Sequence, residues 1–469
     1  MKKQKETLLE TLSEMRAFLL LWLTQAFSGL GSAMTGYCLV IWSYSQKGSA
    51  LMTSLLMVCS YAPYVLFSIF AGALSDRWDK KKTMLVCDTV AAATTVAMVV
   101  LLQNDLLQIW HLYLINVVNG LMNTVQQPAS EVAVTRLLPK KHYQRVGGLR
   151  YLSSSVNSIL TPIIATAVLG LVGMGAVVAF DLFSFVTAFL VLLFAIKIPE
   201  GEAAQSVKGM QPGEAAQSVK GMQPEEAVRS MEGRQPAEAA RASDSLLKSV
   251  GEGIAYLKRE RGIFDLILFL AAINLVASIY DAAFPAMLLS REGGSEKVLG
   301  MVNAVIGIST LAGSLIASWV KAPKSRVRVI CNCLLFSMSF ENFMLALGRT
   351  PLVWCIGGFL GWIAIPLMNA NLDVILRLRI PDSMQGRVYS VRNSLQFFTI
   401  PVGYFLGGLL VDAVFEPVMA MQKEGSLLVR LFGEGKGSGA AFLFFVIAFA
   451  GIGVCLYFRH DRHIWELEK

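Results

Sequence analysis

Long apolar runs alternate with short polar connections along the whole chain. A helix of about 20 apolar residues crosses the hydrocarbon core of a bilayer, and helices are expected there because they satisfy their own backbone hydrogen bonds. Twelve runs approach this length, at residues 18–42, 51–74, 83–102, 109–126, 149–171, 176–196, 263–289, 298–320, 327–347, 352–376, 395–414 and 440–458. The pattern predicts an all-α membrane protein with twelve transmembrane helices. The first run is longer than a signal peptide and lacks a small-residue cleavage site, so we expect it to be a permanent span.

The composition supports this class of protein. Of the 469 residues, 55% are apolar and only 16% are charged, and the mean hydropathy is +0.56. A soluble protein of this length carries more charge on its surface, so an ordinary soluble enzyme is excluded and we expect no enzymatic activity. The seven cysteines lie in or beside the apolar runs, and their spacing predicts neither a disulfide framework nor a metal site.

The positions of Lys and Arg predict the orientation of the chain. Most of the 41 basic residues fall in the alternate connections that include both termini. Because cytoplasmic loops retain positive charge, both termini are predicted to be cytoplasmic in a multi-pass plasma-membrane protein. This topology and an attraction to anionic lipids account for the net charge of +8, so membrane lipids are expected partners and nucleic acid is not.

A repeat separates the first six runs from the last six. Residues 201–212 recur without change at 213–224, and a degenerate copy fills 225–236. The Ala, Glu, Gln and Ser content of these copies cannot form a core, and a proline in each interrupts any helix. We therefore expect an N-terminal six-helix bundle over residues 1–198, a cytoplasmic linker over 199–245, an amphipathic helix on the inner membrane surface over 246–262, and a C-terminal six-helix bundle over 263–469.

The two bundles show faint similarity at a constant offset of 242 residues. The corresponding positions run from the end of one span through a basic loop into the next: Glu131, Pro139, Arg145, Val146 and Arg150 match Asp373, Pro381, Arg387, Val388 and Arg392. Five positions can agree by coincidence. Their common structural place nevertheless favours two pseudo-symmetric six-helix repeats of parallel orientation.

Polar residues recur at helical spacing in four spans that are equivalent under this repeat. Side chains spaced by three or four residues share one face of a helix, so these faces are candidates for the wall of a central cavity. The candidates are Gln25, Ser28, Ser32, Thr35, Asn116, Asn119, Asn123, Gln126, Asn274, Ser278, Tyr280, Trp354, Trp362 and Asn369. The alternative is hydrogen bonding between helices inside each bundle, which for any single serine is the more common role.

Three of the carboxylic acids within the spans are candidates for a functional role. A carboxylate in a membrane helix is costly and marks function in many proteins, so Asp281, Asp181 and Glu341 are candidates for proton coupling. Asp281 is the foremost candidate, since it continues the polar face of its span. The alternative for each acid is a pairing role that serves structure alone.

The string GALSDRWDKKK over residues 72–82, with Gly72, Asp76, Arg77, Lys80 and Lys81, resembles the loop signature of the major facilitator superfamily. Its DRxDKK form is similar to the macrolide-efflux and siderophore-export branch. Further similarity lies in Gln127-Pro128-Ala129, in Asp181, and in the glycines that lead to Asp412, namely Gly403, Gly407 and Gly408.

This resemblance implies two six-helix domains that rock about a central site. It also implies a gate in which Asp76 contacts the start of the eleventh span and Arg77 pairs with Glu131. The alternative for the lysines is a stop signal that fixes topology. We expect a monomeric exporter of an amphipathic small molecule, such as a macrolide-like drug, that works by alternating access in exchange for protons, with no cofactor and the proton gradient as its energy source. The alternatives are an exporter or flippase of a siderophore or lysophospholipid, and a sensor or scaffold that has lost transport.

Overall fold

The structure is a computed structural model that describes residues 14–137, 143–198 and 251–468; the side chains of 69–77, 135, 143–148, 150–152, 382–383, 385–387 and 390 are not described. All regular elements of the described residues are helical. The first group of helices is α2 (Arg16–Lys47), α3 (Ala50–Arg77), α4 (Lys80–Gln103), α5 (Ile109–Leu137), α6 (Tyr143–Leu171) and α7 (Met174–Leu190) with the π-turn η2 (Val191–Ala195). We call this group the N-half.

The second group, the C-half, follows the linker. It contains α12 (Arg261–Ser290), α13 (Glu296–Trp319), α14 (Arg326–Leu347), α15 (Pro351–Ile363), α16 (Ile365–Arg379), α17 (Asp382–Phe397), α18 (Thr399–Leu410), the π-turn η3 (Val411–Phe415), α19 (Glu416–Ala420), α20 (Leu427–Phe432), α21 (Ser438–Arg459) and α22 (Arg462–Glu466). Helices α15 and α16 together make one long rod, as do α17 and α18. Prolines near the two junctions explain the breaks, because proline lacks the backbone N–H of a helix interior.

The expected all-α membrane fold is confirmed. Within the described residues, eleven helices are long and apolar enough to span a membrane. Helix α5 is equally long, but the polar face with Asn116, Asn119 and Asn123 makes it less apolar than the others. It also continues to Leu137, well beyond the predicted end at residue 126. Apolar runs mark only the hydrocarbon-embedded part of a helix, and polar residues continue it into the interface.

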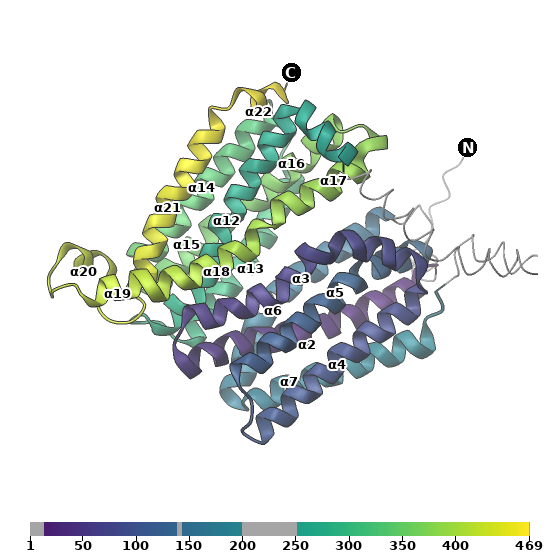
Figure 1. Cartoon of the computed structure of the whole chain (residues 1–469), viewed down its shortest axis with the longest axis horizontal. Coiled ribbons are helices and arrows are strands. Elements are labelled where there is room, and N and C mark those ends of the chain that lie inside the picture. Colours follow the sequence, from purple (N-terminus) through teal and green to yellow (C-terminus); the bar gives the residue numbers. More distant parts are fainter. Residues whose placement is uncertain (1–13, 138–142, 199–250, 469) are drawn as a thin grey trace, which may run out of the picture.

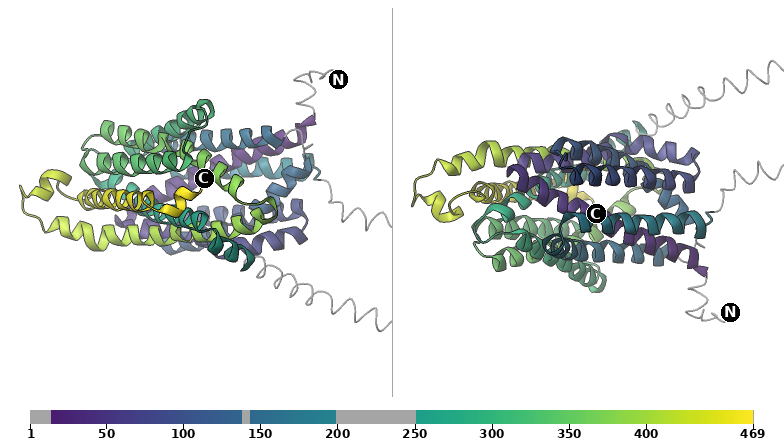
Figure 2. Two further views of the ribbon diagram at one scale, coloured as in Figure 1. Left: turned by 90° about the horizontal axis from the view of Figure 1, so that it is seen from above. Right: turned by 90° about the horizontal axis from the view of Figure 1, so that it is seen from below.

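The helices run approximately side by side, and the two halves face one another along their length (Figure 1). We call the end of the molecule at which residues 198 and 251 lie the linker end, and the opposite end the loop end. The two halves converge near α18 and α6 and diverge towards α17 and α22 at the linker end (Figure 1). Views from above and below show that the α19–α20 hairpin protrudes at the loop end (Figure 2). The 12-residue repeat lies outside the described residues.

The buried cores of the halves differ. In the described part of the C-half one continuous apolar cluster joins α12, α14, α15 and α21. The N-half instead holds smaller separate clusters around Leu21, Met34, Leu39 and Phe18. Among the described residues, apolar packing is therefore continuous in the C-half and divided in the N-half.

A buried guanidinium holds the loop end of the C-half together. Arg291 follows α12 and is only 5% exposed. It donates to the carbonyl oxygens of Leu345 and Ala346 at 2.7 and 3.0 Å, and to that of Phe432 at 3.0 Å. Burial, and then the nearby charge of Arg349, lower the pKa of Arg291 to about 10. Since the last carbonyls of a helix lack intrahelical donors, Arg291 caps α14 and α20 together.

Arg291→Met is expected to destabilise the protein, because three buried carbonyl groups lose their donor. We expect a loss of roughly 3 kcal/mol, as unpaired buried polar groups cost about 1–3 kcal/mol each and water compensates in part. Thermal unfolding in detergent, followed by a thiol-reactive fluorophore on the free cysteines, measures this loss. Arg430→Met is the control, since Arg430 is exposed at the same end. Equal melting temperatures for the two variants would contradict the capping role.

Candidate functional site

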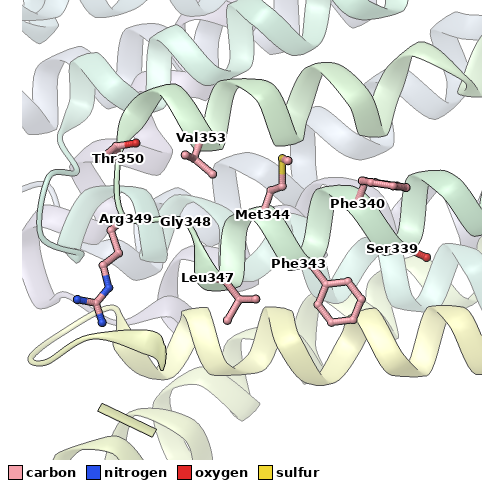
Figure 3. A pocket seen from close by; sticks show the side chains of 9 residues that line it. All are labelled: Ser339, Phe340, Phe343, Met344, Leu347, Gly348, Arg349, Thr350 and Val353. Carbon is pink, nitrogen blue, oxygen red and sulfur yellow. The ribbon is translucent and has the colours of Figure 1, made fainter. Parts of the chain in front are cut away.

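A first hollow lies on the outer surface of the C-half (Figure 3). Its volume is about 550 Å³, and its walls come from α14, α15 and the turn between them. The lining is apolar, with Phe340 and Leu347 exposed on the outside of the bundle. Since it touches one half only and faces away from the other, this hollow belongs to the lipid-facing surface.

A second hollow lies between the two halves, and we call it the central cavity. It measures about 580 Å³ and takes its walls from α2 and α6 of the N-half and α12, α13 and α15 of the C-half. Its aromatic wall consists of Tyr37, Tyr280, Phe284 and Trp362. Its polar lining consists of Ser154, Asn157, Ser158, Thr161, Asn303 and Thr310, with Asp281 as the one carboxylic acid among the described lining residues. A pocket of this size with a few polar groups suits an amphipathic small molecule.

Asp281 differs from the other two candidate acids in the contacts of its carboxyl group. Among the described residues, no side chain or backbone group makes a hydrogen bond or ion pair with its carboxyl group. It lies on α12 between the central cavity and an inner pocket of the C-half, and it lines both. A carboxyl group without a protein partner is costly in a membrane unless water or a ligand solvates it, so the geometry makes Asp281 available to a ligand.

Glu341 is held in place by two donors. The Tyr280 hydroxyl and the Trp362 Nε1–H both donate to Glu341 Oε1, at 2.7 and 3.0 Å. These bonds join α12, α14 and α15. Gly361 lies against the carboxyl group, and a Cβ there would collide with Glu341 Oε2 and lie 2.6 Å from its Cβ. Glycine at this position therefore makes room for the acid.

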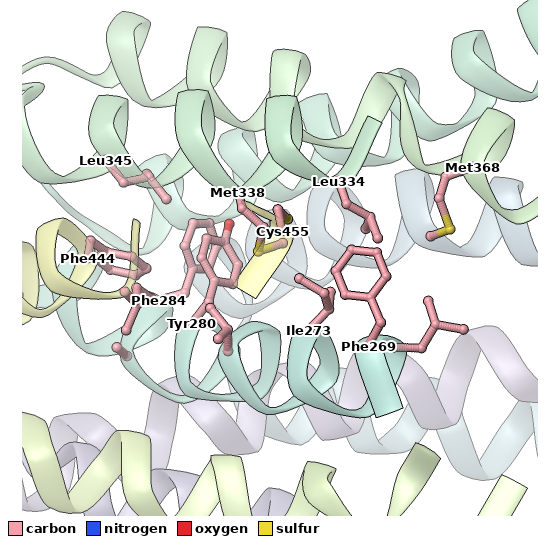
Figure 4. Packing of buried hydrophobic residues seen from close by; sticks show 14 of the residues in the cluster. Phe269, Ile273, Tyr280, Phe284, Leu334, Met338, Leu345, Met368, Phe444 and Cys455 are labelled. Atoms are coloured by element: carbon pink, nitrogen blue, oxygen red, sulfur yellow. The ribbon is translucent and has the colours of Figure 1, made fainter. Parts of the chain in front are cut away.

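Tyr280, Glu341 and Trp362 line the inner pocket of the C-half. It measures about 200 Å³, and all its walls come from the C-half. Tyr280 stacks on Phe284 with 5.2 Å between ring centroids and meets the edge of Phe444 at 5.3 Å, among the packed residues shown in Figure 4. Asn274 and Asn369, both expected in a cavity from their spacing, line the inner pocket.

The third acid, Asp181, belongs to the interior of the N-half. Ser32 donates to Asp181 Oδ1 at 3.0 Å across α2 and α7. The Cβ of any other residue at Gly31 would lie 2.9 Å from the Asp181 Cα, so the glycine allows the two helices to approach. Asp181 lines neither the central cavity nor the inner pocket. Its contacts match the structural alternative for this residue.

Part of the polar face of α2 and α5 is also used inside the N-half. Gln126 Nε2 donates to Asp88 at 2.6 Å, and Thr94 donates to Asn119 at 3.0 Å. Asn116 lines a smaller hollow of about 250 Å³ with Tyr61 and Tyr404, where α2, α3, α5 and α18 meet. None of the hollows described above is lined by the remaining candidates of the two helices, which are Gln25, Ser28, Thr35 and Asn123.

Two candidates on the C-half serve packing. Trp354 is fully buried in the core and donates from Nε1 to the carbonyl of Gly348 at 3.0 Å. Ser278 packs against Gly403 of α18, where a Cβ would lie 2.5 Å from the serine Cβ. Tyr280 and Trp362 reach both the central cavity and the inner pocket.

The sequence analysis missed the polar faces of α6 and α13. Ser154, Asn157 and Thr161 are spaced by three and four residues, and Asn303 and Thr310 by seven. Both sets line the central cavity. The same search for helical spacing, extended to the fifth and eighth spans, finds them.

The linker-end gate implied by the resemblance is described only in part. The side chains of Gly72, Asp76 and Arg77 lie outside the described residues, so the Arg77–Glu131 pair does too. Lys81 Nζ donates to the carbonyls of Leu193 and Ile196 at 2.9 and 2.7 Å, which caps the end of η2. Lys80 is buried and donates to the Trp78 carbonyl at 3.2 Å.

The repeat-related residues are also described only in part. Asp373 is exposed near the end of α16 and lies close enough to Arg392 for a charge interaction. Arg392 Nε donates to Gln396 Oε1 at 3.0 Å. The side chains of Arg145, Arg150 and Arg387 lie outside the described residues.

One group of side chains at the linker end has ligand atoms close enough for a metal ion. The ligand atoms of Asp265, Asp461 and His463 lie within 4.8 Å of one another. Asp461 accepts from the His463 backbone at 2.8 Å and caps α22, while His463 Nδ1 lies 2.9 Å from Asp265 Oδ2. These contacts fasten α22 to α12 and give the three residues a structural role.

Asp412 joins the two halves at the loop end. Its carboxylate, on η3 of the C-half, accepts from the Ser49 hydroxyl at 2.5 Å and from the backbone N–H groups of Ala50 and Leu51 at 3.0 Å each. It thus caps the first turn of α3 in the other half, where the helix dipole favours negative charge. Gly408, one turn earlier, allows this approach, because a Cβ there would collide with Ser54 and lie 2.6 Å from the Leu51 Cα.

A second close contact between the halves joins α6 and α13. A Cβ on Gly300 would lie 2.5 Å from Thr166 Oγ1, and one on Gly307 would lie 2.8 Å from Ile159 Cγ1. Both glycines therefore bring α13 directly against α6. Together with the Asp412 contact, they close the loop end of the molecule.

Comparisons with known proteins agree with this architecture. The family profile described as Major Facilitator Superfamily matches residues 21–322. Macrolide efflux protein A of Streptococcus pyogenes is 20% identical over 401 residues, which are 85% of this chain and 90% of that protein. Multidrug efflux pump Tap of Mycolicibacterium fortuitum is 20% identical over 397 residues, covering 82% and 87%.

A solved structure shows the same fold. A bacterial homologue of the iron transporter ferroportin, in an inward-facing state, superposes with a TM-score of 0.65 at 14% identity, covering 97% of this chain and 99% of that one. The chain belongs to the Major Facilitator Superfamily of membrane transporters. Within that superfamily its relatives include macrolide and multidrug efflux proteins, so the predicted resemblance is confirmed.

Asp412→Ala is expected to open the loop end, because the first turn of α3 loses its acceptor in the other half. Loss of an N-cap costs about 1–2 kcal/mol, which raises the open population by roughly fivefold or more. Labelling of a cysteine placed at Ser54, in a background without the native cysteines, measures this opening, since Ser54 is fully buried. A cysteine at Ser184, buried within the N-half, is the control. Unchanged labelling at position 54 would contradict a gating role for Asp412.

Proposed function

We propose that this protein is an exporter that moves an amphipathic small molecule, its cargo, out of the cell in exchange for protons. The observation that carries the proposal is the Asp281 carboxyl group, which has no partner among the described residues and lies in a cavity between two helix bundles. The similarity to macrolide and multidrug efflux proteins supports a drug-like cargo. Its direction of transport is proposed from the same relatives.

The chemistry of the central cavity favours a cargo with a basic amine. A protonated amine and the Asp281 carboxylate attract one another strongly where water is scarce. Tyr280, Phe284 and Trp362 offer ring faces to an apolar body and to a cation. Because a proton and an ammonium group compete for the same carboxylate, binding of one promotes release of the other, and this competition couples the two movements.

We propose that the structure represents the state open to the cytoplasm. The distribution of Lys and Arg makes the linker end cytoplasmic, and the contacts of Asp412, Gly300 and Gly307 close the opposite end. Outward opening would break these contacts, and at the linker end Asp76 would then contact the start of the eleventh span.

We also propose that the protein works as a monomer in the plasma membrane, driven by the proton gradient. One chain supplies both walls of the central cavity, so a second copy is not needed to complete it. No described residue is required to hold a cofactor for this exchange.

Asp281→Asn is expected to abolish coupled extrusion, since an amide can neither take up a proton nor pair with an ammonium group. Loss of about 1.4 kcal/mol of charge pairing alone lowers affinity about tenfold. Uptake of erythromycin into inverted vesicles, in which the cytoplasmic face is outside, measures the effect with and without a protonophore.

Asp105→Asn is the matched control for this substitution. Asp105 is exposed at the loop end with φ at 56°, a conformation that asparagine also tolerates. We expect it to transport as the native protein does. The proposal fails if collapse of the proton gradient leaves extrusion unchanged, or if Asp281→Asn retains both transport and its pH dependence.

Deletion of residues 201–236 is expected to leave erythromycin extrusion intact, because the repeat has the composition of a spacer. The remaining residues of the linker must still span the two halves, so a Gly/Ser replacement of equal length is the control. Loss of extrusion in the deletion but not in the replacement shows a length requirement, whereas loss in both variants contradicts the spacer role.

A further inference from the structure

The inner pocket of the C-half is not used by the proposed cargo. Its volume of about 200 Å³ is below that of pockets for drug-sized ligands, and all its walls come from α12, α14, α15, α16 and α17. Along α12 it extends from Asp281 to Leu270, about 16 Å at 1.5 Å per residue. Its polar lining consists of Asn274, Ser337, Glu341, Asn342, Asn369 and Gln396.

A buried polar atom in this pocket lacks a partner. Asn342 is 2% exposed, and its Nδ2 donates to the carbonyl of Met338 at 2.8 Å. Its Oδ1 has no hydrogen-bond partner among the described residues, although it is buried. An unpaired buried amide oxygen is costly, and a polar pocket of this size has room for several water molecules that would pair it.

The pocket has a mouth and a closed end. Asn369 of α16 is exposed, and it marks a side at which the pocket is open. Glu341 is 4% exposed and lies at the inner end. Tyr280 and Trp362 hold Glu341 Oε1, and its Oε2 has no hydrogen-bond partner among the described residues. That oxygen is therefore free to accept from water in the pocket.

The inner pocket and the central cavity share one wall. Tyr280, Asp281 and Trp362 line both, so the two acids approach the wall from opposite sides, Asp281 at the cavity and Glu341 within the bundle. The titratable groups that face the pair among the described residues are Tyr280 of α12 and Tyr404 of α18. No described lysine or arginine pairs with either acid, and Arg392 of α17 reaches only as far as Gln396.

We propose that the inner pocket is a water-filled side path that carries protons to Glu341 without passing through the central cavity. A hydronium ion at the Asn369 mouth passes its proton along the water molecules paired with Asn274, Ser337 and Asn342. Glu341 Oε2 accepts the proton and water remains. A further water at the shared wall then relays a proton between Glu341 and Asp281, so that one acid is neutral when the other is charged.

The side path lets protons reach Glu341 while cargo is bound, and in this respect the inference rests on the proposed function. A bulky cargo in the central cavity blocks water from the cavity side of Asp281, whereas the inner pocket is too small for the cargo to enter. Glu341 therefore stays in contact with protons while cargo is bound. The presence of water in the pocket can be tested without any cargo.

Hydroxyl-radical footprinting of the native protein in nanodiscs tests for that water. Met338 and Met368 line the pocket and are 8% and 6% exposed, while Met34 and Met98 lie in apolar cores of the N-half and are 0% and 1% exposed. We expect Met338 and Met368 to be oxidised several times faster than the two controls. Asn342→Leu, which keeps the size of the side chain and removes its amide, is expected to lower the oxidation of Met338 to the level of the controls.

Asn303→Leu is the matched control variant, because Asn303 makes the same kind of bond to its own helix, at 2.9 Å, but lines the central cavity. It is expected to leave the oxidation of Met338 unchanged. Equal oxidation of all four methionines in the native protein would show a dry pocket and overturn the proposal, whether or not the protein exports erythromycin.

Proton uptake by the purified protein after a drop in pH provides the second measurement, with a pH-sensitive dye and no cargo. Glu341→Gln is expected to take up fewer protons. Asn342→Leu is expected to take up as many protons as the native protein but several times more slowly, while Asn303→Leu keeps the native rate. If Asn303→Leu slows uptake and Asn342→Leu does not, protons enter through the central cavity and the side path is refuted.

Discussion

The cost of an unpaired polar group in hydrocarbon governs this structure. Asp181 is paired by Ser32, Glu341 by Tyr280 and Trp362, and Asp412 by the first turn of α3. Each of these acids holds two or more helices in register. Asp281 alone among these acids lacks such a partner in the described residues, and it borders the two hollows that water or a ligand can fill. The cost of an unpaired acid thus explains the contacts of the other three acids and marks Asp281 as the one available to water or a ligand.

Glycine contacts determine how the two halves meet. Gly300 and Gly307 bring α13 against α6, and Gly408 brings α18 against α3. Helices that touch through glycine have few interlocking side chains, and their association depends on close packing, with little to hinder separation. The polar contact added by Asp412 lies at the loop end, where water can replace it on opening. Under the proposed alternating access, such contacts would stabilise one state and still permit the other.

The two halves supply different kinds of groups to the central cavity. The C-half has a continuous apolar core. The same half carries Asp281, Glu341, most of the aromatic wall and the inner pocket. The N-half has smaller apolar clusters and polar pairs such as Gln126 with Asp88 and Thr94 with Asn119. It contributes Tyr37 of α2 and the polar side chains of α6 to the opposite wall of the central cavity. The C-half thus supplies the carboxylic acid of the central cavity, and the N-half supplies uncharged hydrogen-bonding groups.

The sequence by itself determined the helices, their number to within one weakly apolar span, and the polar face of α12 that carries Asn274 and Asp281. Apolar length and helical spacing are local properties, so they can be read along the chain. The tertiary structure decided which polar faces meet the central cavity. None of the candidates on α2 and α5 lines it, whereas polar residues of α6 and α13 do, and Asp181 differs from Asp281 only through its neighbours. Spacing shows which residues share a face, but what that face touches depends on helices that are distant in the sequence.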